Sequence, residues 1–174
     1  MRKNKPSNFI TYIIYAAIIL VLPVFIYSCE KKEPAVQPNT EDIMVKVAKQ
    51  FPEYDNNNSR TVYKSNDKNK ELSDKTAVEL YSDDKNKPID LSKIEQYSII
   101  KADDAEIGIF KLYDKTNSEY VKEMSRTRIS KMQSASNEIT NDAETRSYGN
   151  YVYYVSHPQK DKIFEIIENS LKGV

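Results

Sequence analysis

The single cysteine of this sequence, Cys29, has the most informative surroundings of any reactive side chain. It follows a long uncharged and apolar run at 9–27, and a basic segment with Arg2, Lys3 and Lys5 precedes that run. A basic start, an apolar stretch, a small residue and then cysteine form the layout of a lipoprotein signal. In that chemistry the cysteine thiol receives a diacylglyceryl group and becomes the new N-terminus. Two acyl chains, at ~0.8 kcal/mol per buried methylene, then hold the protein at a membrane.

The same segment also fits an uncleaved transmembrane helix. Tyr27 is bulky where a lipoprotein signal usually has a small residue, and the apolar run is longer than the ~7–15 residues of a cleaved signal. Its length is close to the ~20 residues that span a bilayer, and Pro23 is tolerated inside such a helix. Both interpretations anchor the chain in the cell membrane by its N-terminus, with the domain on the extracytoplasmic side. We expect 1–28 to be a signal or anchor, 29–39 a linker and 40–174 a single domain.

Metal and nucleophile chemistry have little support in the sequence. The only histidine, His157, lies at an expected helix start; a lone histidine cannot form a His-rich zinc site, and no second thiol is available. The acidic stretch 84–95 resembles a calcium loop only faintly, because Ile89 stands where the loop needs glycine. No nucleophile-elbow sequence accompanies the serines. We therefore expect no catalytic residues, no metal and no cofactor, and we expect His157 to be structural.

Three residues are candidates for contact with a ligand or a partner. Arg128 shares one side of an expected helix with Val121 and Met124, so it either forms a partly buried ion pair or reaches a ligand carboxylate or phosphate. Tyr151 and Tyr153 lie in a tyrosine-rich strand, where they either form the edge of the core or offer an aromatic platform to a sugar or a partner. The sequence leaves both pairs of alternatives open.

The charge distribution excludes nucleic acid as a partner. Three of the 26 basic residues precede Cys29 and all 26 acidic residues follow it, so the exported part has a net charge of −3. Nucleic-acid binding needs a clustered basic surface, which this evenly mixed sequence lacks. Three hypotheses remain: a non-enzymatic binding or accessory module for an envelope protein or cell-wall ligand, a carboxylate-dependent envelope hydrolase, and a structural docking subunit of a membrane complex.

Hydrophobic periodicity predicts the elements that position these residues. The expected helices are 40–51, 71–81, one of about twenty residues from Thr116, and a last one ending at a Gly173 cap. The expected strands are 94–102, 105–113 and 148–155. Gly108, inside the second strand, predicts a bulge or the close approach of a neighbour.

The expected order of elements is helix, helix, strand, strand, helix, strand, helix. Capping boxes, Thr116 with Glu119 and Ser156 with Gln159, are expected to open the two later helices. Strands 94–102 and 105–113 should form an antiparallel hairpin, whereas the polar stretches 53–69 and 137–147 are expected to be loops. The fold class is α+β, with a small, largely antiparallel three-stranded sheet covered on one face by helices.

Several short motifs in the exported part share their order with a known family. They are Glu79-Leu80-Tyr81, Ile94-x-x-Tyr97, Ala105-Glu106-Ile107-Gly108-Ile109-Phe110-Lys111, Val121-x-x-Met124-x-x-x-Arg128 and Gly149-Asn150-Tyr151-Val152-Tyr153-Tyr154-Val155-Ser156. In these motifs the chain resembles the bacterial domain-of-unknown-function 4358 family over about half its length. The resemblance implies a lipid-anchored envelope protein of Gram-positive-type bacteria. The family brings no established activity and no catalytic residues.

The lipoprotein interpretation makes a prediction about the mature protein. After extraction from membranes, we expect the mass of residues 29–174 plus a diacylglyceryl group on Cys29, because lipidation precedes cleavage before the cysteine. Intact mass spectrometry measures this directly. A mass that still includes residues 1–28 would contradict a cleaved lipoprotein and support the uncleaved transmembrane helix.

Overall fold

The computed structural model describes residues 37–51, 54, 61–102, 105–135 and 142–174. These residues fall within one compact unit, Val36–Val174. Cys29, the expected signal or anchor and most of the expected linker lie outside the described residues. Within the described residues, no helix is both long and apolar enough to span a bilayer.

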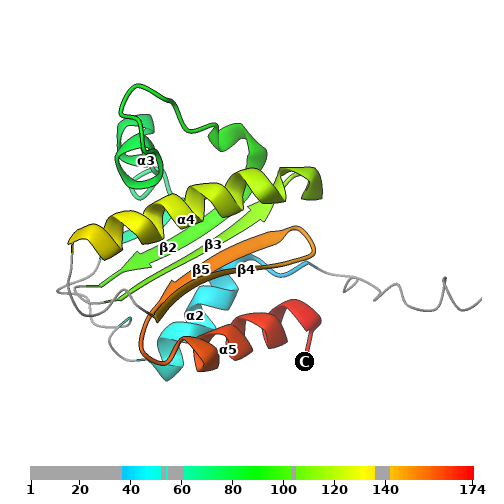
Figure 1. Cartoon of the computed structure of the whole chain (residues 1–174). Helices are drawn as coiled ribbons and strands as arrows, with labels where there is room; N and C mark the ends of the chain where they lie inside the picture. The colour runs from blue at the N-terminus through cyan, green and yellow to red at the C-terminus, as the bar shows by residue number, and fades with distance from the viewer. Residues whose placement is uncertain (1–36, 52–53, 55–60, 103–104, 136–141) are drawn as a thin grey trace, which may run out of the picture. The chain divides into compact units, whose positions relative to one another are not determined.

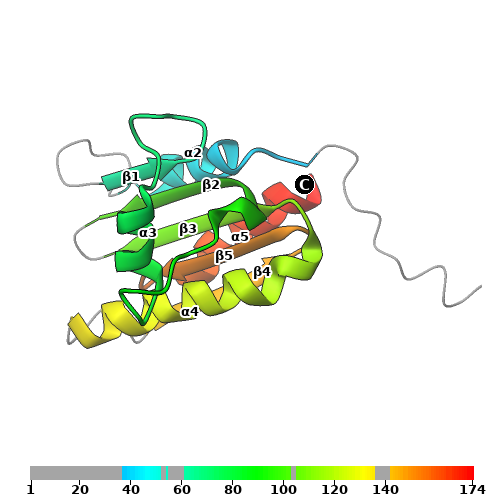
Figure 2. The ribbon, with the colours of Figure 1, turned by 90° about the horizontal axis from the view of Figure 1, so that it is seen from above.

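The described chain forms one antiparallel sheet with helices on both faces (Figure 1). The five strands lie in the order β1-β2-β3-β5-β4 (Figure 2): β1 Thr61–Lys64, β2 Ile94–Lys101, β3 Glu106–Leu112, β4 Ala143–Tyr148 and β5 Tyr151–Ser156. One face is covered by α3 (Asp74–Tyr81) and α4 (Ser118–Ala135), and the other by α2 (Thr40–Gln50) and α5 (Lys160–Lys172). Short 3₁₀ turns, Leu91–Lys93 and Lys115–Asn117, precede β2 and α4.

The α+β class and the β2–β3 hairpin are confirmed, but the expected three-stranded sheet is wrong. The sheet gains an edge strand on each side, and both lie in stretches expected to be loops. β4 and β5 form a hairpin in which Tyr148 pairs with Tyr151 around Gly149 and Asn150. Gly149 has φ 54°, a left-handed conformation that glycine adopts without strain at a tight turn. Because β4 and β1 are half-exposed edges, their sequences are polar and lack a strand-like apolar pattern.

The expectation that helices cover only one face is also wrong, because each face of the sheet has its own core. Alternate side chains of β3 point to opposite faces. Ile107 and Ile109 pack with α2 and α5, whereas Phe110 and Leu112 pack with α3 and α4. All six residues of β5 are buried. A strand covered on both faces has a continuous apolar run, which is why the sequence shows β3 and β5 so clearly.

The helix starts differ from the expected capping boxes. Asp114 caps the 3₁₀ turn before α4 by accepting a hydrogen bond from the Thr116 N–H at 2.8 Å. Before α5, His157 Nδ1 accepts from the Gln159 N–H at 2.9 Å. The imidazole is buried and packs edge-on against the Phe51 ring, with centroids 5.3 Å apart. His157 is therefore placed as a structural residue of the turn. The expected cap at Gly173 is confirmed by its φ of 73°.

Gly108 marks the close approach of a neighbouring side chain. This was one of the two alternatives that the sequence predicted for this glycine, the other being a bulge. It pairs with Tyr154 across the β3–β5 ladder, and a Cβ atom at position 108 would lie 2.2 Å from Cε1 of the Tyr154 ring. The ring also stacks on Phe110, with centroids 6.2 Å apart. The missing side chain at position 108 thus provides the space that the tyrosine ring occupies.

This close approach predicts a large cost for Gly108→Ala. The added methyl group must displace a buried ring, so we expect a loss of about 1–3 kcal/mol in the free energy of unfolding. Denaturant unfolding of the full chain measures it. In a Tyr154→Leu background the same change should cost less, because the ring that meets the methyl group is gone. An equal cost in both backgrounds would contradict this account of Gly108.

Candidate functional site

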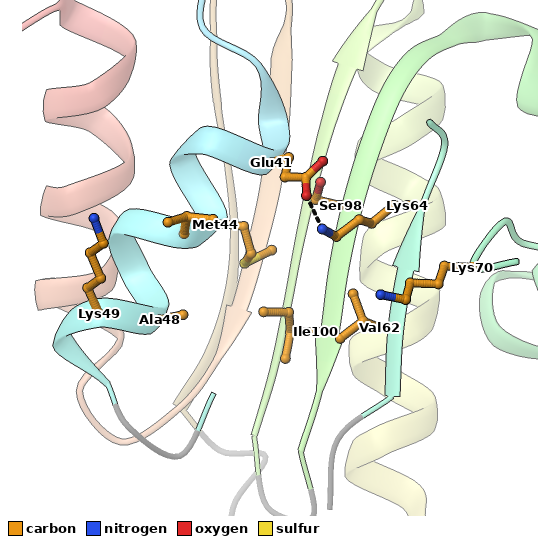
Figure 3. A pocket seen from close by; sticks show the side chains of 10 residues that line it. Glu41, Met44, Ala48, Lys49, Val62, Lys64, Lys70, Ser98 and Ile100 are labelled. Atoms are coloured by element: carbon orange, nitrogen blue, oxygen red, sulfur yellow. Dashed lines mark hydrogen bonds and ion pairs between the residues drawn. The ribbon is translucent and has the colours of Figure 1, made fainter. Parts of the chain in front are cut away.

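An open groove lies between α2 and the β1 edge of the sheet (Figure 3). Its volume is about 290 Å³. The lining residues are Glu41, Met44, Val45, Ala48 and Lys49 from α2, Val62 and Lys64 from β1, Lys70 from the loop after β1, and Ser98 and Ile100 from β2. The groove therefore combines an apolar floor with a charged rim.

The positions of these side chains follow from the local structure. In β1, Val62 and Lys64 are two residues apart and so point to the same face of the sheet. The strand register places Val62 opposite Ile100 and Lys64 opposite Ser98. On the helix side, the Asn39 side chain caps α2 by accepting from the Glu41 N–H at 2.8 Å. This cap holds the glutamate in the first turn, beside the strand.

The start of α2 is also tied directly to the sheet. Thr40 Oγ1 and Ser98 Oγ are buried and lie 3.0 Å apart, within hydrogen-bond distance. Farther along the helix, Ile43 and Val47 are fully buried in the core shared with α5. The helix therefore cannot slide along the sheet without breaking a buried contact, and the width of the groove is fixed at this end.

Glu41 is held by two donors, one of which, Lys64, lies across the groove. Lys64 Nζ forms an ion pair with Glu41 Oε1, and Asn66 Nδ2 donates to Glu41 Oε2 at 2.9 Å. The hydrogen bond from Lys64 lowers the pKa of Glu41 below its usual range, and the bond from Asn66 acts in the same direction. The carboxylate is therefore ionised at neutral pH and links α2 to β1.

The groove has a net positive charge. Lys49, Lys64 and Lys70 lie among the described residues that line it, against one carboxylate, that of Glu41. Lys70 also forms a longer, exposed ion pair with Asp67 at 3.8 Å. Positive charge above apolar side chains suits a ligand that has an anionic group next to an apolar part. In the described part of the chain, no three His, Cys, Asp or Glu residues are placed to hold a metal ion.

A second polar cluster lies inside the core between the sheet and α4. Arg128 Nε and Nη2 donate to the two carboxylate oxygens of Glu106, at 2.8 and 2.5 Å. Tyr154 Oη donates to the same carboxylate at 2.5 Å and lies 2.9 Å from Tyr81 Oη. A hydroxyl has a single proton, so Tyr81 donates to Tyr154. All four residues are buried.

Burial and charge shift the pKa values in this cluster in consistent directions. Desolvation raises the pKa of Tyr81 and of Tyr154, and the charge of Glu106 raises both further. Burial alone would lower the pKa of Arg128, but the hydrogen bond and charge of Glu106 outweigh it and raise that pKa. The tyrosines therefore stay neutral and the arginine charged, which keeps the hydrogen-bond directions fixed.

The sequence-predicted contact residues lie away from the groove. Arg128 is in the buried ion pair with Glu106, which matches the paired alternative for this residue. Tyr151 is 4% and Tyr153 1% exposed, so both rings lie in the core rather than on an open platform. Tyr151 Oη donates to the Pro38 carbonyl at 2.6 Å, which fastens the chain just before α2. Cys29 lies outside the described residues.

Sequence analysis missed the groove because its outer wall was expected to be a loop. Val62 and Lys64 belong to a strand of four residues, too short to show a period. Glu41 and Lys70 are ordinary surface residue types, and only the pairing of β1 with β2 brings them together. The apolar triplet 61–63 within a polar stretch was the one local signal for this strand.

Comparisons with known proteins identified no relative of this chain. Neither the family models, nor the curated proteins, nor the solved structures include a significant match to this chain. The resemblance to the domain-of-unknown-function 4358 family stays a prediction from the motifs.

The buried ion pair predicts that Arg128→Lys lowers stability. Lysine keeps the charge but cannot donate two parallel hydrogen bonds to Glu106, so we expect a loss of about 1–3 kcal/mol in the free energy of unfolding. The matched control is Arg126→Lys on the same helix, whose exposed pair with Glu123 should change stability by less than ~0.5 kcal/mol. Denaturant unfolding compares the two. Unchanged stability together with lost ligand binding would instead assign Arg128 a ligand role.

Proposed function

We propose that this chain is a membrane-anchored extracytoplasmic binding module without catalytic activity, and that the groove between α2 and β1 is its ligand site. The groove supports this proposal because it is open to solvent, apolar at its floor and positive at its rim. Small-molecule sites in proteins are concave and mostly apolar, with a few placed polar groups. The signal-like N-terminus supports the anchor, and the motif resemblance supports a place in a bacterial cell envelope.

The exposed apolar surface also favours the groove as the binding site. Large apolar side chains that are strongly exposed in the described part of the chain are Val45, Tyr113 and Val174. Val45 is 46% exposed on α2, and it lines the groove. An exposed aliphatic side chain beside buried Met44 widens the apolar floor toward solvent, where a ligand can cover it.

At the groove, the charge state of Glu41 favours binding over hydrolysis by a carboxylate. A carboxylate-dependent hydrolase needs an acid whose pKa is raised so that it holds a proton. The described carboxylates with clearly shifted pKa values are all lowered, each chiefly by a hydrogen bond: Glu41, Asp90, Asp114, Glu119 and Glu144. The carboxylate in the groove is among them, and it is committed to Lys64 and Asn66.

The proposal is tested by a binding screen on the full chain in lipid nanodiscs. A panel of small acids, amines and neutral compounds is read by ligand-observed NMR, with empty nanodiscs as the blank. We expect the bound compounds to be mainly acids with an apolar part. Ala48→Phe should abolish their binding, because the added ring fills the apolar floor.

The matched control adds the same ring elsewhere. Asn169→Phe places it on the exposed side of α5, outside the groove, and should leave binding unchanged. Compounds that bind equally well to the Ala48→Phe protein would place the site elsewhere. Chemical conversion of a bound compound would contradict a purely binding role and favour the hydrolase.

A further inference from the structure

We infer that the groove recognises an aliphatic carboxylate, that is, a carboxylate attached to a short unbranched apolar chain. This inference rests on the proposed function of the groove and names its ligand class. It combines three observations: a pair of side-chain donors that already bind a carboxylate, a neighbouring lysine on the same wall, and an apolar floor of limited volume.

The donor pair is formed by Lys64 and Asn66. Each donates to a different oxygen of the Glu41 side chain, so the two donors match the spacing of a carboxylate. Of these two donors Lys64 lines the groove, so a carboxylate in the groove has an ammonium group within reach on this wall. The Glu41 carboxylate shows which chemistry Lys64 accepts on this wall of the groove.

Lys70 provides a second positive charge for the ligand. Figure 3 shows Lys64 and Lys70 reaching the groove from the strand side, near Val62. The pair of Lys70 with Asp67 is long and exposed, and such pairs are weak. A ligand carboxylate can therefore bind Lys70 and share Lys64 with Glu41, and it reduces the net positive charge of the groove.

The apolar floor determines the other half of the ligand. Met44, Val62 and Ile100 form it, with no charged side chain between them in the view of Figure 3. A volume of about 290 Å³ is at the small end of ligand sites, which suits a chain of roughly four to eight carbons. Each methylene that reaches the floor should tighten binding by up to about fourfold. A larger amphiphile would leave much of its chain in water.

Glu41 competes with the ligand, and this competition provides a specific test. Its charge lies on the donors that the ligand needs, so removing the charge should strengthen the binding of an anion and weaken that of a cation. A groove that bound its ligand only through the apolar floor would show neither change. The effect of Glu41 thus separates carboxylate recognition from unspecific apolar binding.

The experiment measures hexanoate binding to the full chain in lipid nanodiscs by isothermal titration calorimetry. Butanoate, hexanamide and hexyl phosphate are the comparison probes, and empty nanodiscs give the blank. We expect hexanoate to bind several-fold more tightly than butanoate, and hexanamide to bind at least about tenfold more weakly than hexanoate, because the amide lacks the charge. Ala48→Phe should abolish hexanoate binding.

Three lysine variants and one glutamate variant complete the design. Lys70→Gln should weaken hexanoate binding about fivefold or more, and Lys70→Arg should restore it, because it restores the charge. Lys85→Gln removes the same charge at an exposed turn outside the groove and should have no effect. Glu41→Gln should tighten hexanoate binding. Circular dichroism verifies that each variant is folded.

The outcomes separate this inference from the proposed function. Hexyl phosphate binding more tightly than hexanoate, with the same dependence on Lys70, would overturn the carboxylate assignment and leave an anion-binding groove in place. If neither Lys70→Gln nor Glu41→Gln changes the affinity for hexanoate, the proposed recognition of the carboxylate is overturned. No binding of either anion to the groove would overturn the inference, whereas the proposed function is overturned only if no compound of the screen requires an open groove at Ala48.

Discussion

The packing of one whole face of the sheet depends on a single buried carboxylate, that of Glu106. This side chain lies on the central strand β3, 3% exposed, and it accepts both hydrogen bonds of the Arg128 fork and a third from Tyr154. A buried carboxylate without partners would cost several kcal/mol, so each partner has to be in place once the strand is buried. Through Tyr154 and Tyr81 the network reaches α3, and through Arg128 it fixes α4. One charge on β3 therefore positions two helices.

This network in turn constrains the strands beneath it. Tyr154 reaches Glu106 because its ring crosses the position where Gly108 has no side chain. The ring then stacks on Phe110 and meets Tyr81 nearly edge-on, with an angle of 70° between the ring planes. A polar network inside a core specifies one arrangement, because a shifted register would leave its donors and acceptors unpaired. The glycine, the ring and the ion pair thus form one unit, and none of them is explained alone.

The sequence predicted the parts of this structure that depend on local pattern. The central strands, the four helices and the close approach at Gly108 follow from periodicity and composition. The hairpin that adds β4 could also have been predicted, since Gly149-Asn150 between two strand-like segments is a typical two-residue turn. The partner of Arg128 could not be predicted, because Glu106 lies 22 positions away in the sequence and only the packing of α4 on β3 brings the two residues together. The place of Lys64 and Lys70 in one groove could not be predicted either, because only the tertiary structure brings them together.

The two faces of the sheet differ in a way that bears on binding. On the face toward α4, the buried cluster of Glu106, Arg128, Tyr154 and Tyr81 pairs its charges and hydroxyls with one another inside an apolar core. The face toward α2 is closed mainly by apolar packing with α5, and its outer wall is a strand of four residues with one neighbouring strand. Across that wall the tie is the Glu41–Lys64 pair, and a ligand anion at Lys70 can share its lysine. A site there can accept an external carboxylate without unpacking the core, whereas an external carboxylate could reach Arg128 only if the second core opened.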